Sequence, residues 1–324
     1  MKESMQKVRE LEKQLFGYSY AMRVIDFDSE TIAPEDSNDG RAEAMEFLSR
    51  QSFDLLVNDR TAALLKAAAA DAETEQEQAE VRNLQREYDE IAKIPAAEYA
   101  AFTKLCQQSI PAWTKAKRTN DFRVFAPYLE KIVAARRAQA AYFDPERDPY
   151  EVFLDRYERG LTIAQCDAFF AQLRETIVPL LAEIQKRGAP IRTDFLDQEW
   201  PIDAQKKVSE KIMQLWGMDP KRSMLAESEH PFTTEFWRKD VRITTHYMPR
   251  DMFSNLYSVA HEGGHALYEL NINPDYDYTS VTGGATMGLH ESQSRLFENI
   301  VGRSRAFVEY LYPTLKELFP QQLA

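Results

Sequence analysis

The sequence predicts a mostly α-helical fold with one small β element ahead of its most histidine-rich helix. From the N-terminus to about residue 186, Ala, Leu, Glu, Gln, Lys and Arg recur at helical periodicity. The segment 240-DVRITTHYM-248 instead alternates β-branched and polar residues, which is typical of a strand. After residue 251 the helical period returns.

The helices of the first half should end at short segments rich in Pro, Gly, Asn or Asp, because these residues break a helix or favour turns. We expect ordinary to long helices with short connections between them. The expected breaks are 33–40, Pro95, Pro111, 119–121, 144–149 and 187–190.

The composition is that of a globular protein and excludes several function classes. The 324 residues are 44% hydrophobic and 28% charged, enough for one large domain or two. A formal net charge of -12 has the wrong sign for a nucleic acid or an anionic membrane surface. No stretch approaches the roughly 18 apolar residues of a membrane span, and no signal peptide is evident.

Two cysteines, Cys106 and Cys166, are too few for a disulfide framework and lack the spacing of a thiolate metal site. Their scarcity fits a reducing compartment, so we expect a cytoplasmic protein. Any bound metal must then use His and carboxylate ligands.

The residues before and within the histidine-rich helix are the most informative part of the chain. We expect 240–248 to be a strand at the edge of a small sheet. Pro249 and Asp251 suit a helix start, and Asn271 with Pro274 suits its end.

Within this helix, 261-HEGGH-265 has the pattern of a metal site. Met252, Leu256, Val259, Gly263, Leu267 and Leu270 fall on one stripe, and the two histidines point away from it. His261 and His265, four residues apart, lie about 6 Å apart along the axis and can share a zinc ion. Glu262 cannot ligate with them but can reach a water on the ion as a general base. A chance match remains the alternative, on the order of one in a hundred such chains.

A catalytic zinc needs a third protein ligand. Glu269 is a poor candidate, because positions i, i+4 and i+8 spread over about 12 Å of helix; we expect it to orient His265 or to face solvent. The segment 289–302 reads as a second helix, with Glu291 in its first turn as the preferred ligand and Glu298 as its rival or an ion-pair partner of Arg295 or Arg303. We expect the apolar side chains of that helix to point inward: Leu289, Leu296 and Ile300.

These motifs resemble the thermostable (Taq-type) carboxypeptidases, which are HExxH metallopeptidases with a largely helical fold. The matching segments are FDSETIAP (27–34), DPYEVFLDRYERG (148–160), PIDAQKK (201–207), HPFTT (230–234), DVRITT (240–245), HEGGHALYE (261–269) and HESQSR (290–295).

The resemblance implies a metallocarboxypeptidase that releases single residues from peptide C-termini. It implies zinc or cobalt as the metal, a homodimer as the assembly, and Glu262 as the base. The implied ligands are His261, His265 and Glu291. The residues it implies for lining or bracing a substrate groove are Asp240, Arg242, Thr244, His230 and His290.

Members of this family are commonly about half as long again and carry further C-terminal motifs, including an arginine for the substrate's terminal carboxylate. The sequence ends at 316-KELFPQQLA-324 without them. We expect a helical region over 1–190 and a metal-binding catalytic region over 191–324, in one continuous fold that is C-terminally incomplete. Arg242 could replace the missing arginine, or it could pair with Asp240.

Three hypotheses follow from these observations. The first is a metal-dependent carboxypeptidase, with Tyr257 or Tyr268 as candidates to steady an oxyanion. An endo-acting oligopeptidase with the same metal site is its variant. The second is an inactive, shortened paralogue or fragment that binds metal or a partner. The third is a helical scaffold with an accidental motif.

Overall fold

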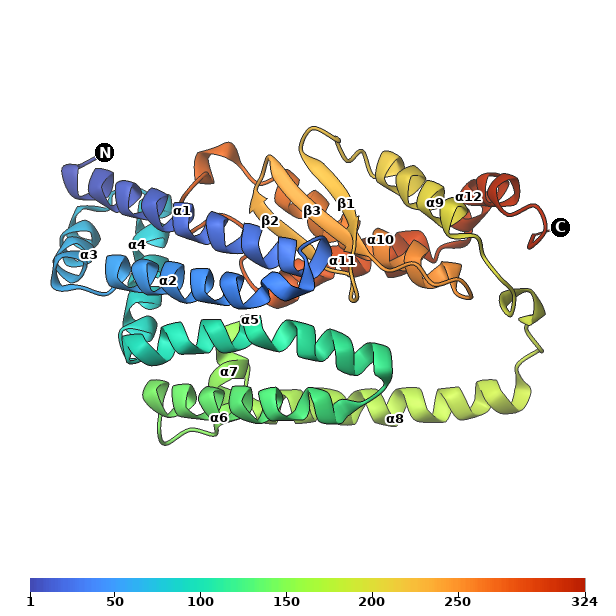
Figure 1. Cartoon of the computed structure of the whole chain (residues 1–324), viewed down its shortest axis with the longest axis horizontal. Helices are drawn as coiled ribbons and strands as arrows, with labels where there is room; N and C mark the ends of the chain where they lie inside the picture. The colour runs from blue at the N-terminus through green and yellow to red at the C-terminus, as the bar shows by residue number, and fades with distance from the viewer. Residues whose placement is uncertain (324) are drawn as a thin grey trace.

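The computed structural model describes residues 1–323 and has the expected mostly helical architecture. Its first half contains α1 (Glu3–Thr31), α2 (Asn38–Leu56), α3 (Asp59–Asp71), α4 (Glu75–Ile91), α5 (Ala96–Thr119), α6 (Ala126–Phe143), α7 (Pro149–Tyr157) and α8 (Ile163–Arg187). Its second half contains α9 (Ile202–Leu215), β1 (Ser223–Glu227), β2 (Thr233–Trp237), β3 (Asp240–Thr245), α10 (Met252–Leu270), α11 (Met287–Arg295) and α12 (Arg305–Leu318). Figure 1 shows the sheet and α10 in the upper half of the molecule and α6 and α8 along the lower edge.

All but one of the predicted breaks fall at helix boundaries, and three further boundaries, at 57–58, 72–74 and 158–162, were not predicted. Pro111 lies inside α5, which continues to Thr119. A proline in a helix interior costs about 3 kcal/mol or more. Packing of α5 along α2 offsets that cost, so the helix continues through it.

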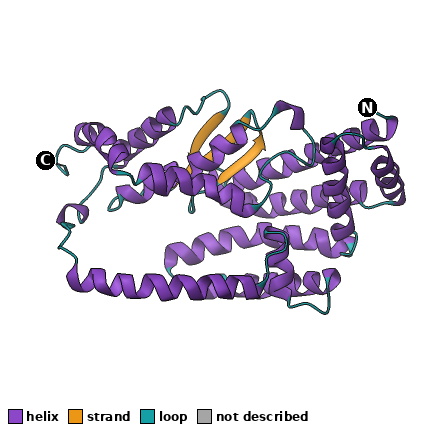
Figure 2. Ribbon diagram, turned by 180° about the vertical axis from the view of Figure 1, so that it is seen from behind, coloured by secondary structure: helices purple, strands orange, loops and turns teal. Residues whose placement is uncertain are grey.

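The small sheet precedes α10 as predicted, but the expectation that 240–248 forms an edge strand is wrong. The strand order is β1-β3-β2, which makes β3 the central strand. It pairs in parallel with β1 and antiparallel with β2. Val241, Ile243, Thr244 and Thr245 are all buried, because their strand is covered on both faces. Figure 2 shows the strands against the purple helices from behind.

The core has two parts. One lies among α1, α2, α3 and α4, around Met5, Leu56, Leu65 and Leu84. The other lies between α9, the sheet, α10 and α12; its members include Trp200, Val208, Ile212, Ile243, Met252, Val259 and Phe319. The second core therefore fixes α10 against the sheet, and α10 carries the histidines.

One of the contacts between the two halves of the chain is that of α1 with β2 and β3. The Tyr20 hydroxyl donates to Asp240 Oδ2 at 2.8 Å. Arg23 pairs with Glu235 at 2.9 Å. No helix among residues 1–323 is both long and apolar enough to cross a membrane.

Candidate metal centre

Helix α10 presents two different faces, as its sequence predicts. Met252, Leu256, Val259 and Leu270 are buried in the core. The Asp251 carboxylate caps the helix by accepting the Ser254 N–H at 3.0 Å. His261 and His265 lie on the other face, with 19% and 12% of their side chains exposed.

His261, His265 and Glu291 form the one group of three metal-ligating side chains found in the described part of the chain. Glu291 Oε2 lies 3.6 Å from His261 Nε2 and 3.3 Å from His265 Nε2. Two ligand atoms at about 2.0–2.1 Å on a tetrahedral ion lie about 3.3 Å apart. The spacing and the donor set of two imidazoles and one carboxylate therefore fit a divalent metal such as zinc.

Gly264 lets Glu291 reach the histidines. A Cβ at Gly264 would lie 2.7 Å from the Gln293 carbonyl oxygen and 2.8 Å from Ser294 Cα, so α11 crosses α10 at a distance that only glycine permits. Gly263 is similarly covered by Trp216. Thr286 caps α11 by accepting the Leu289 N–H at 3.1 Å.

The segment 289–302 is not one α-helix with its apolar side chains inward. Helix α11 ends at Arg295 and continues as a π-helical turn, η5 (Leu296–Gly302). Leu289, Leu296 and Ile300 are 45%, 41% and 69% exposed. The side facing α10 carries the small residues Ser294 and Gly302, because close approach of the two backbones leaves no room for leucine.

Glu298, the predicted rival ligand, contacts the other nitrogen of His261. Its Oε2 lies 2.9 Å from His261 Nδ1. Arg303 and Arg295 also pair with this carboxylate, at 2.8 Å and 3.4 Å. Burial opposes ionisation of Glu298, but the bonds from Arg303 and His261 outweigh it and lower the pKa of Glu298. A carboxylate in this position fixes the tautomer and orientation of a metal-binding histidine.

Glu269 does not orient His265 and does not face solvent. It is 5% exposed, and its Oε1 lies 2.9 Å from His290 Nε2. That hydrogen bond raises the pKa of His290, whose ring stacks on His265 at 4.4 Å between centroids. Burial lowers the pKa of His265 to about 4, with His290 and His261 adding to the effect. His265 is therefore neutral near pH 7, the form that binds metal.

Glu262 lies on the side of α10 that faces β2. It is 7% exposed, and the Thr233 hydroxyl lies 2.7 Å from its Oε2. Burial raises the pKa of Glu262, and the bond from Thr233 acts in the opposite direction. Thr233 belongs to the matching segment HPFTT (230–234), but no role was predicted for it. It reaches Glu262 because its strand, β2, packs on α10.

A cavity of about 520 Å³ adjoins the metal-ligand cluster. His261 and Glu262 form one wall, and His230, predicted to line a substrate groove, lies on it as well. The Arg303 guanidinium stacks over the Tyr257 ring, 3.7 Å from its centroid. Tyr257, a candidate to stabilise an oxyanion, is therefore packed against a cation. The cavity also reaches Arg295, which donates to Glu291 at 2.8 Å. Burial works against ionisation of Glu291, but Arg295 and His261 lower its pKa.

The remaining predicted groove residues lie elsewhere. Arg242 pairs through two nitrogens with Asp240, both at 2.8 Å, which is the alternative weighed for it. Thr244 is fully buried, and its hydroxyl accepts the Phe232 N–H at 2.9 Å. None of these three lines the cavity beside the cluster. Tyr268 lies edge-on to His290, at 5.4 Å between ring centroids.

Known proteins match this architecture over almost the whole chain. The model of the family described as carboxypeptidase Taq (M32) metallopeptidase matches residues 7–324. "Carboxypeptidase 1" of Bacillus subtilis (strain 168) is 36% identical over 97% of this chain and 63% of its own length. The crystal structure of BsuCP has a TM-score of 0.96 at 35% identity, covering 99% of this chain and 65% of that one.

The Pyrococcus furiosus carboxypeptidase structure named Apo-Mg has a TM-score of 0.88 at 34% identity, covering 99% of this chain and 65% of that one. The chain therefore spans slightly less than two thirds of the relatives that it matches. Sequence motifs, fold and family model agree: the chain belongs to the carboxypeptidase Taq (M32) metallopeptidase family.

Proposed function

We propose that this chain is a metal-dependent carboxypeptidase that removes C-terminal residues from peptides. The observation that carries the proposal is the His261, His265 and Glu291 cluster, with the buried Glu262 on the wall of the adjoining cavity. Family membership gives the same reaction class. The proposed ion is zinc or cobalt, since two imidazoles and one carboxylate suit either.

In this proposal, His261, His265 and Glu291 would hold a divalent ion, which would supply Lewis-acid polarisation of the scissile carbonyl and a lowered pKa for the attacking water. Glu262 accepts the proton of that water and later returns it to the leaving amine. The raised pKa of Glu262 suits both roles, because a carboxyl group whose pKa lies nearer the working pH both accepts and releases a proton readily. Thr233 holds the carboxylate in position, and Glu298 holds His261.

Two arginines support recognition of a carboxylate by the same cavity. Arg295 and Arg303 line it, and their side chains are 56% and 47% exposed. Each already contacts a glutamate, but the exposed guanidinium edges retain donors for a second carboxylate. Arg242 is less suitable for binding the carboxylate of a substrate, because two nitrogens of its guanidinium group already donate to Asp240.

The test compares a free-ended peptide with its C-amidated twin, each incubated with metal-loaded protein and followed by mass spectrometry. A ladder that loses one residue at a time from the free end alone, and disappears with a chelator, is the expected result. Cleavage of both twins would favour the endo-acting alternative. Metal uptake without any cleavage would favour a metal-binding chain that is inactive at this length.

A further inference from the structure

Helix α8 has an apolar face that no other part of the described chain covers. Phe170, Ile177, Leu181 and Ile184 are spaced seven, four and three residues apart, so they fall on one stripe of the helix. These four residues are between 50% and 56% exposed. None of the 25 residues of α8 is buried.

The polar side chains of α8 do not attach it to its neighbours either. The Thr176 hydroxyl donates to the Gln172 carbonyl oxygen at 2.9 Å, and Arg187 pairs with Glu183 at 2.7 Å. Both contacts stay within the helix. A helix that is not packed against anything is only marginally stable in water, so α8 needs a partner surface that the described chain does not supply.

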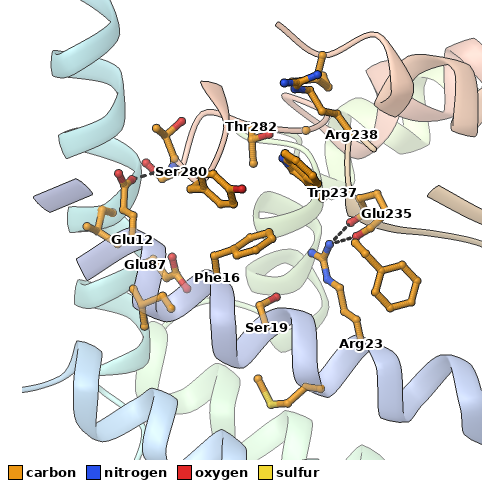
Figure 3. Close-up of a pocket in the computed structure, with 18 of the residues that line it drawn as sticks. Glu12, Phe16, Ser19, Arg23, Glu87, Glu235, Trp237, Arg238, Ser280 and Thr282 are labelled. Atoms are coloured by element: carbon orange, nitrogen blue, oxygen red, sulfur yellow. Dashed lines mark hydrogen bonds and ion pairs between the residues drawn. The ribbon is translucent and has the colours of Figure 1, made fainter. Parts of the chain in front are cut away.

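Another long helix shows what α8 lacks. Helix α1 buries Met5, Val8 and Leu11 in the core that it forms with α2, α3 and α4. Figure 3 shows, at the edge of a cavity between α1 and the sheet, Arg23 of α1 paired with Glu235 of β2 at 2.9 Å. Both apolar and polar contacts therefore hold α1 in place, and neither kind holds α8.

The relatives nevertheless keep α8 in the same place. The match to the BsuCP crystal structure covers 99% of this chain, α8 included, with a TM-score of 0.96. The part of BsuCP that matches this chain does not supply a contact for the helix, so something outside the match must cover it. The match covers 65% of BsuCP, and 64% to 65% of the other four solved relatives.

Two other kinds of occupant fit the observations less well. A helix that lies on an anionic membrane is rich in Lys and Arg on its polar face. The charged residues of α8 are balanced instead, three of each sign: Asp167, Glu175, Glu183, Arg174, Lys186 and Arg187. A second copy would cover the face only in the assembled state, whereas the residues outside the match are part of every copy of a relative.

We propose that the apolar face of α8 is the docking surface for a helical polypeptide equivalent to the third of each relative that lies outside the match. This partner presents an apolar helix face to the stripe formed by Phe170, Ile177, Leu181 and Ile184, because two helices bury such stripes by packing against each other. The inference does not rest on the proposed function, since neither a catalytic residue nor a bound metal enters it.

The experiment produces the 324-residue chain together with a second polypeptide, made of the residues of Bacillus subtilis carboxypeptidase 1 that lie outside the match. Hydrogen exchange of backbone amides is followed by mass spectrometry, at a dilution at which this chain alone is monomeric. We expect the two polypeptides to purify together and amide exchange along α8 to slow at least ~10-fold.

The matched part of Bacillus subtilis carboxypeptidase 1 is the positive control, because it shows whether the second polypeptide can bind as a separate chain. Binding to that control but not to this chain, or binding to this chain without slower exchange in α8, would overturn the proposal. If the control does not bind either, the same residues are joined to this chain through a flexible linker. Unchanged exchange in α8 of the joined protein would then overturn it.

The variant Ile177→Lys/Leu181→Lys places two charges on the apolar face and should weaken binding of the second polypeptide at least ~10-fold. Ala168→Lys/Gln172→Lys adds the same charge on the opposite face and should bind as the wild type does. Thermal unfolding of each variant verifies the fold. Equal weakening by both pairs would contradict docking on the apolar face. Slower exchange that appears only when this chain is concentrated, and that the second polypeptide leaves unchanged, would assign the face to a second copy and overturn the proposal.

Discussion

At the scale of single residues, the site depends on which neighbour each ionisable group has. Helical spacing predicted the two histidines and Glu262, because an i, i+4 pair has a fixed geometry. Glu291 was the preferred third ligand because it lies in the first turn of the next predicted helix. The same reasoning also rejected Glu269 as a ligand and gave ion pairs with Arg295 or Arg303 as the alternative for Glu298, and those pairs are present. It did not predict correctly which histidine each of these two glutamates would contact. Their roles depend on where α11 and η5 cross α10, and Glu298 meets His261 while Glu269 meets His290.

The proposed roles of Glu262 and Glu291 can be separated by two substitutions. Glu262→Gln removes the base but no ligand, so we expect unchanged metal content and a loss of turnover on the order of 10²–10⁴-fold. Glu291→Ala removes a ligand, so we expect metal to be lost on dialysis. Elemental analysis and peptide turnover measure both. Metal retained by the Glu291 variant at the wild-type level would contradict the ligand assignment.

At the scale of secondary-structure elements, the sequence predicted the order of helices and the strand before α10. It placed β3 at a sheet edge because an alternating pattern usually marks one buried face. On the polar side of the alternation, Thr244 is instead fully buried, and its hydroxyl accepts the Phe232 N–H at 2.9 Å. The apolar residues of 289–302 were expected to point inward, but they are largely exposed. The residues that face α10 there are a serine and a glycine.

Gly264 is where this close packing can be tested. Gly264→Ala places a methyl carbon 2.7 Å from a backbone oxygen of α11, which cannot rotate away, so α11 must shift and carry Glu291 with it. We expect destabilisation by about 1–3 kcal/mol. Metal affinity should fall on the order of 10–100-fold, as when a ligand loses its support.

The matched control for that variant is Gly17→Ala in α1, where an added Cβ meets nothing within 4 Å. This change should leave metal affinity unaltered and stabilise the protein by roughly 0.5–1 kcal/mol. Chemical denaturation and competition with a metal-binding dye measure the two quantities. A Gly264 variant with wild-type metal affinity would show that the glycine does not set the position of Glu291.

At the scale of the whole molecule, α8 is the element least explained by the packing of this chain. None of its 25 residues is buried. The exposed apolar side chains along it are Phe169, Phe170, Ile177, Val178, Leu180, Leu181 and Ile184. Figure 1 shows α8 running along the lower edge of the molecule before the chain returns to α9. A monomer rarely leaves so continuous an apolar surface in water.

We therefore expect the 324-residue chain to self-associate through α8 as its concentration rises, which sedimentation velocity would detect. Ile177→Lys/Leu181→Lys puts two charges, one helical turn apart, on the apolar face and should weaken association at least ~10-fold. Ala168→Lys/Gln172→Lys has the same spacing and added charge on the opposite face, so it should associate as the wild type does. Equal weakening by both pairs would mean that net charge, rather than the apolar face, governs association. No association in the wild type would mean that this face is tolerated in water.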